Sequence, residues 1–174
     1  NRAYEKAEKG DHYGAISDFT KAIEINPSEG AYYNRGISKY EIKDYYGAIS
    51  DYTKAIEISP NLESAYYNRG IAKTALKDHY GAISDYTKTI EINPKKDQAY
   101  YNRGNRKFSI KDYYGAISDY TKAIEINPKK FKAYANRGIA KEEIGDLKGA
   151  CSDWRQTESL SPNSPAAKWL RDEC

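Results

Sequence analysis

The sequence predicts an all-α fold in which antiparallel helix pairs stack into a solenoid. Segment 112–128, DYYGAISDYTKAIEINP, is almost identical to the segments that begin at Asp44 and Asp78. Glycines recur every 34 residues, at Gly47, Gly81, Gly115 and Gly149. Each copy also contains two stretches with apolar residues at helical spacing. A fixed period of this length is typical of a solenoid, in which each unit packs on its neighbours.

The first helix of each unit is predicted from the copy between Ala31 and Pro60. Its first half has no proline and carries apolar or small residues at spacings of three and four: Tyr32, Gly36, Ile37 and Tyr40. Glycine inside a helix costs roughly 0.5–1 kcal/mol relative to alanine. Its recurrence mid-helix therefore predicts close packing against the second helix, although inheritance of duplicated copies is an alternative reading.

The second helix is predicted to begin after Asp44, whose carboxylate is placed to cap it. Equivalent aspartates stand in the other copies, at Asp11, Asp78, Asp112 and Asp146. Its apolar side is predicted to contain Tyr45, Ala48, Ile49, Tyr52, Ala55 and Ile56. Pro60 ends the unit, as equivalent prolines do elsewhere.

We expect a single repeat domain over residues 1–174. The predicted units are 1–28 with a truncated first helix, 29–62, 63–96, 97–130 and 131–163, followed by a capping helix over 164–174. In the last unit Glu158 replaces an isoleucine, so a polar outer face is expected at this end. The chain has no methionine and opens inside a repeat, which predicts that it is a fragment or a processed form.

Composition excludes several functional classes. The net charge of +3 is too small, and too mixed with 25 acidic residues, to require a polyanionic partner. No apolar run approaches the roughly 20 residues of a membrane helix. No nucleophile elbow, phosphate loop or metal-ligand spacing occurs in the sequence, so no catalytic residue and no cofactor is predicted.

The cysteines and histidines are expected to be structural. Cys151 and Cys174 form no CxxC pair, which predicts neither a disulfide framework nor a zinc site and favours a reducing, cytoplasmic compartment. Cys151 takes the place of an isoleucine and is expected to be a small buried group, whereas Cys174 is expected to be exposed. His12 and His79 stand where other copies have tyrosine and are expected to pack rather than bind a metal.

The order of aromatic, Gly, Ala, aromatic, Ala and Pro over 34 residues resembles the tetratricopeptide repeat (TPR), in its bacterial type with NRG and AISDYTKAIEINP motifs. The signature positions in the second copy are Tyr32, Gly36, Ala48, Tyr52, Ala55 and Pro60. This resemblance covers essentially the whole chain and implies a right-handed superhelix. Two departures recur in four copies: arginine where the family usually has leucine, and lysine where it usually has tyrosine.

The recurring arginines need anionic partners, because an unpaired buried charge is expensive. Aspartates recur at a matching height on the second helix, which predicts the pairs Arg35–Asp51, Arg69–Asp85, Arg103–Asp119, Arg137–Asp153 and Arg2–Asp18. The alternative reading is a row of arginines that binds phosphate or carboxylate groups. Because the partners match in number and spacing, the structural reading is favoured.

The resemblance implies that first helices line a concave groove that binds extended peptides. The implied groove residues are Tyr33, Asn34, Ile37, Tyr40, Tyr67, Asn68, Ile71, Tyr101, Asn102, Asn105, Phe108 and Asn136. An asparagine amide can pair with both a backbone C=O and an N–H, and tyrosine adds rigid contact area. The alternative is that these asparagines and tyrosines only pack against their neighbours.

These residues predict a non-catalytic scaffold that binds a peptide segment of another protein, for assembly or targeting of a complex. The basic positions of the clamp with which some TPR proteins bind heat-shock-protein tails hold uncharged residues here, apart from Lys132, so that ligand is not expected. Two alternatives stay open at this point. One is self-association, for example as a homodimer, and the other is RNA binding, which steep salt dependence would reveal.

Overall fold

The computed structural model describes residues 2–162, 164 and 174. Within them the chain forms ten α-helices and no β-strand. It divides into two compact units, Asn1–Ile92 and Asn93–Cys174. None of the helices in the described part of the chain is both long and apolar enough to cross a membrane.

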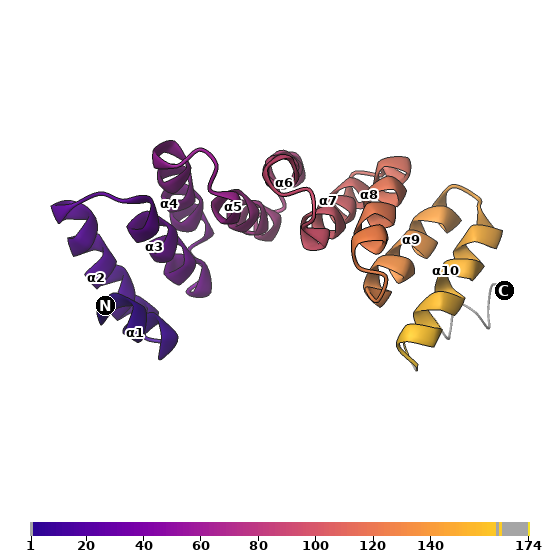
Figure 1. Cartoon of the computed structure of the whole chain (residues 1–174), viewed down its shortest axis with the longest axis horizontal. Helices are drawn as coiled ribbons and strands as arrows, with labels where there is room; N and C mark the ends of the chain where they lie inside the picture. The colour runs from indigo at the N-terminus through magenta and orange to yellow at the C-terminus, as the bar shows by residue number, and fades with distance from the viewer. Residues whose placement is uncertain (1, 163, 165–173) are drawn as a thin grey trace. The chain divides into compact units, whose positions relative to one another are not determined.

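The first unit contains six helices, arranged as three pairs (Figure 1). They are α1 (Arg2–Glu8), α2 (His12–Ile25), α3 (Glu29–Glu41), α4 (Tyr45–Ile58), α5 (Glu63–Ala75) and α6 (His79–Ile92). Within this unit, each helix packs mainly on its neighbours along the chain. Ala48 and Tyr52 of α4 are buried against Ala72 of α5, so the core lies between successive pairs.

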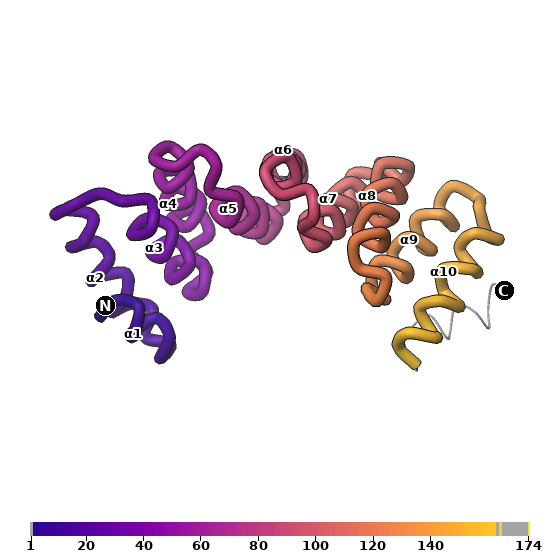
Figure 2. Tube along the Cα trace, viewed as in Figure 1, coloured from indigo at the N-terminus to yellow at the C-terminus, as the bar shows by residue number. Residues whose placement is uncertain are grey.

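The second unit contains four helices, arranged as two pairs. They are α7 (Asp97–Ser109), α8 (Tyr113–Ile126), α9 (Phe131–Glu143) and α10 (Leu147–Leu160). Figure 2 follows the chain over the short turn from α9 to α10. Ala116 and Tyr120 of α8 pack on Ala140 of α9, which repeats the arrangement of the first unit.

Capping explains where the second helix of each pair begins. Asp44 Oδ1 accepts a hydrogen bond from the Gly47 backbone N–H at 2.9 Å. The carboxylates of four other aspartates accept the same bond from the glycine three residues further on: Asp11, Asp78, Asp112 and Asp146. A cap of this kind satisfies one of the free amides in the first turn, and it confirms the role predicted for these aspartates.

The mid-helix glycines lie where the two helices of a pair approach most closely. A Cβ atom on Gly36 would meet the Tyr52 ring at 2.8 Å, and one on Gly104 would meet the Tyr120 ring at 2.8 Å. No room is left for a methyl group without moving a buried ring. The predicted close packing of the two helices of a pair is therefore confirmed.

The expectation that the two cysteines form no disulfide was wrong. Cys151 is buried on α10 as predicted, but its sulfur forms a disulfide with Cys174, with the two Cα atoms 5.8 Å apart. The partners are separated by 23 residues without a recognisable motif, and only the folded chain brings them together. The cytoplasmic prediction rested on unpaired cysteines and loses that support, because disulfides persist mainly in oxidising compartments.

The predicted C-terminal capping helix over 164–174 lies outside the described residues, apart from Ser164 and Cys174. The Ser164 hydroxyl donates a hydrogen bond to the Glu158 carboxylate at 3.2 Å. The division into repeats and a single domain stays a prediction.

Candidate functional site

The predicted groove residues all lie on the first helices of the pairs and are all half-buried. Those in the first unit are Tyr33, Asn34, Ile37, Tyr40, Tyr67, Asn68 and Ile71. Those in the second unit are Tyr101, Asn102, Asn105, Phe108 and Asn136. Partial exposure on one helix of each pair is what a ligand-lining surface requires, because a fully buried side chain could not contact a partner.

In the first unit the asparagines and tyrosines are linked to each other. Asn68 Nδ2 donates to the Tyr33 hydroxyl on the preceding first helix at 2.9 Å. Asn34 Nδ2 donates to the Tyr4 hydroxyl at 2.9 Å and to the Gly30 carbonyl at 2.6 Å. Within the described residues no group donates to Oδ1 of either asparagine. Each amide is thus oriented by the array itself and keeps an acceptor for an incoming N–H.

An ion cluster joins the first and second helix of each pair. Arg69 forms two hydrogen bonds with the Asp85 carboxylate, at 2.9 and 2.6 Å, and Lys73 forms an ion pair with it at 2.7 Å. Equivalent clusters join Arg35, Lys39 and Asp51; Arg103, Lys107 and Asp119; and Arg137, Lys141 and Asp153. Asp18 is paired with Arg2 and Lys6.

The five predicted Arg–Asp pairs are confirmed, and they support the structural reading. The arginines also reach the preceding pair, since Arg69 Nη1 donates to the Thr53 hydroxyl at 3.0 Å. The hydrogen bond to Asp51 raises the pKa of Arg35 above its ordinary value. The lysine of each cluster was missed, because the family pattern offered only tyrosine at that position. Its recurrence beside every Arg–Asp pair was the available signal.

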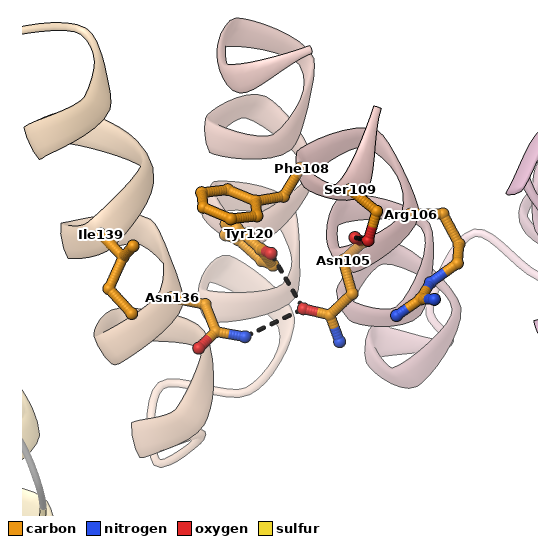
Figure 3. A pocket seen from close by; sticks show the side chains of 7 residues that line it. All are labelled: Asn105, Arg106, Phe108, Ser109, Tyr120, Asn136 and Ile139. Atoms are coloured by element: carbon orange, nitrogen blue, oxygen red, sulfur yellow. Dashed lines mark hydrogen bonds between the residues drawn. The ribbon is translucent and has the colours of Figure 1, made fainter. Parts of the chain in front are cut away.

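The second unit contains a small pocket between α7, α8 and α9, shown in Figure 3. Its volume is about 240 Å³ and it is lined by Asn105, Arg106, Phe108, Ser109, Tyr120, Asn136 and Ile139. Three of the predicted residues, Asn105, Phe108 and Asn136, are brought together here. Arg106, Ser109 and Tyr120 were not predicted to line the groove.

Asn105 is the centre of the pocket's hydrogen bonds. Its Oδ1 accepts from the Tyr120 hydroxyl at 2.8 Å and from Asn136 Nδ2 at 2.9 Å. Asn136 Nδ2 also donates to the Tyr101 hydroxyl at 3.2 Å, which repeats the Asn–Tyr link of the first unit. Burial raises the pKa of Tyr120, so its hydroxyl remains protonated and available as a donor at neutral pH.

Arg106 could have been found by comparing the copies. The second, third and fifth copies read Ile37-Ser38, Ile71-Ala72 and Ile139-Ala140, whereas the fourth reads Asn105-Arg106. In an otherwise near-identical array, these two adjacent polar residues give one first helix a surface chemistry that the others lack.

The described residues contain no group of three His, Cys, Asp or Glu side chains arranged to hold a metal ion.

Comparison with known families identifies the repeat. Tetratricopeptide repeat models match residues 1–29, 30–62 and 63–96, and a TPR repeat model matches 104–145. The chain belongs to the tetratricopeptide repeat family. TPR proteins generally mediate protein–protein interactions and are generally non-catalytic scaffolds. No curated protein matches the sequence.

Solved structures of other TPR proteins are similar to this one. The crystal structure of MamA is 26% identical, with a TM-score of 0.89 over 92% of this chain and 94% of that chain. YrrB, described as a TPR protein with an unusual peptide-binding site, is 18% identical, with a TM-score of 0.87. The match covers 97% of this chain and 88% of that chain. The first TPR of Spaghetti (RPAP3), bound to the HSP90 peptide SRMEEVD, is 28% identical, with a TM-score of 0.61. The match covers 63% of this chain and 87% of that chain.

Proposed function

We propose that this TPR protein is a scaffold that binds a peptide segment of a partner protein along its first helices, for assembly or targeting of a complex. The observation that carries the proposal is the linked row of asparagines and tyrosines. Intramolecular bonds from Nδ2 to tyrosine hydroxyls hold the Asn34 and Asn68 amides in place before a ligand arrives. Groups oriented in advance lose less conformational entropy on binding.

An oriented amide oxygen is suited to the main chain of a peptide. It accepts a backbone N–H whatever the side chain, while the neighbouring tyrosine supplies contact area. Main-chain hydrogen bonds then provide affinity, and side-chain pockets provide specificity. Binding of this kind needs no carboxylate clamp for a chain terminus. The positions at which such a clamp has basic residues hold uncharged residues here, except at Lys132.

A pull-down from source lysate, quantified by mass spectrometry, tests the proposal. The bait is wild type beside a variant that combines Asn34→Ala, Asn68→Ala and Asn102→Ala. We expect a partner to be enriched by wild type and lost by the variant, at unchanged helicity by circular dichroism.

The matched control removes three side chains from second helices instead. Tyr46, Tyr80 and Tyr114 are 76%, 73% and 74% exposed, and their combined replacement by alanine should leave partner recovery unchanged. Equal recovery by wild type and the asparagine variant would refute binding along the first helices. Loss of the partner with the tyrosine control alone would indicate that the partner binds along the second helices.

A further inference from the structure

We propose that the Asn105 pocket binds an acidic side chain of the partner peptide, with an apolar residue of the same peptide beside it. The inference rests on the proposed peptide-binding function and names one residue class that it selects. The pocket is smaller than the roughly 300–1,000 Å³ of small-molecule sites, which suits one side chain.

The amide of Asn105 is fixed with its donors free. Two hydrogen bonds, from Tyr120 and Asn136, both end on Oδ1. Figure 3 shows that the amide nitrogen consequently points away from Asn136, toward the side on which the Arg106 guanidinium lies. In the described part of the chain, Asn105 Nδ2 donates no hydrogen bond.

Arg106 differs from the other cations on its helix. Arg103 and Lys107 are both paired with Asp119, at 2.6 and 2.9 Å. Arg106 forms no ion pair with any described residue, and no acidic side chain lines the pocket. One side of the pocket therefore offers a cation and an amide N–H without an anion, and a carboxylate is the group that complements both.

The other side of the pocket is apolar. Phe108 packs on Tyr113 with ring centroids 5.3 Å apart, and Ile139 lies across from it on α9. A peptide that crosses from α7 to α9 would place an acidic residue near Arg106 and an apolar residue near Phe108. In α3, α5 and α9 the position of Asn105 is held by isoleucine, so this selectivity belongs to α7.

Selection from a phage-displayed library of random dodecapeptides tests the proposal. Wild type is compared with Asn105→Ile/Arg106→Ala, which restores the Ile-Ala pair that α5 and α9 already carry and so should fold. We expect Asp and Glu beside an apolar residue to be enriched at least fivefold by wild type, and this enrichment to be absent from the peptides that the variant selects.

A synthetic peptide from the wild-type selection provides the affinity. Replacing its acidic residue by the corresponding amide should weaken binding to wild type about tenfold, which corresponds to about 1.4 kcal/mol. The variant should bind both peptides equally. Equal acidic enrichment by both proteins, or none by either, would overturn the pocket proposal while leaving peptide binding intact. Failure of wild type to select any peptide would overturn both.

Discussion

Each buried aspartate of the second helices is shared by two cations. Asp85 is 2% exposed and accepts hydrogen bonds or ion pairs from both Arg69 and Lys73. Desolvation of three charges is compensated only while all of them are present, because each remaining charge would otherwise be buried without an opposite partner. The cluster therefore contributes more to the specific pairing of the two helices than to the stability of the fold.

This dependence can be measured by removing the anion. We expect Asp85→Ala to lower the free energy of unfolding by about 3 kcal/mol, because Arg69 and Lys73 then remain as half-buried cations without a counter-charge. The combined variant Arg69→Leu/Lys73→Met/Asp85→Leu should lose less than the single variant. Urea denaturation followed by circular dichroism provides both values. A larger loss in the triple variant would contradict this account.

At the residue scale, a contact could be predicted from the sequence where the two interacting residue types recur in equal numbers. The Arg–Asp pairs were predictable, because matching numbers of opposite charges recur at fixed spacing. The third member, exemplified by Lys73, was missed although it recurs beside every pair, because its reach to the carboxylate depends on helix geometry. The link from Asn68 to Tyr33 was missed for the same reason, although both residues were placed on the same surface.

At the scale of elements, the turn inside the second, third and fourth pairs carries backbone strain. Lys43, Lys77 and Lys111 have φ values of 65°, 60° and 63°, in the left-handed region. The same turn position is glycine in the first and last pairs, where Gly10 and Gly145 have φ values of 81° and 83°. A side chain with a Cβ atom is disfavoured in this conformation, whereas glycine is not.

Glycine at these turns should therefore stabilise the protein. We expect Lys43→Gly, Lys77→Gly and Lys111→Gly each to raise the free energy of unfolding by about 0.5 kcal/mol, after the greater freedom of glycine in the unfolded chain is included. Thermal unfolding of the triple variant is the measurement. The matched control, Lys→Ala at the same positions, removes the charge but keeps the Cβ atom and should not stabilise. Equal gains in both variants would assign the effect to charge.

At the scale of the molecule, the disulfide ties the chain end to α10 of the second unit. The disulfide closes a loop between cysteines with a sequence separation of 23, which restricts the unfolded chain and is worth about 3 kcal/mol in the entropic model. Both tryptophans lie in this unit, and Trp154 is fully buried on α10, so tryptophan fluorescence reports its unfolding.

Reduction should consequently destabilise the second unit. We expect a thiol-free reductant to lower the tryptophan-detected free energy of unfolding by about 3 kcal/mol. Cys174→Ser should show the lower stability in both the absence and presence of reductant. Identical unfolding curves for oxidised and reduced wild type would show that the cross-link carries no stability.

The sequence by itself determined the helix pairs and their caps, because these follow from local periodicity and from single residues such as Asp44 and Pro60. The side that carries the candidate site was implied by the resemblance to the TPR family. Only the tertiary structure decided which side chains from different helices meet. The Asn105–Asn136 bond and the Cys151–Cys174 disulfide depend on distances of a few ångströms across helices or the chain end. Spacing along one chain cannot supply those distances, since they are set by the packing of whole helices on each other.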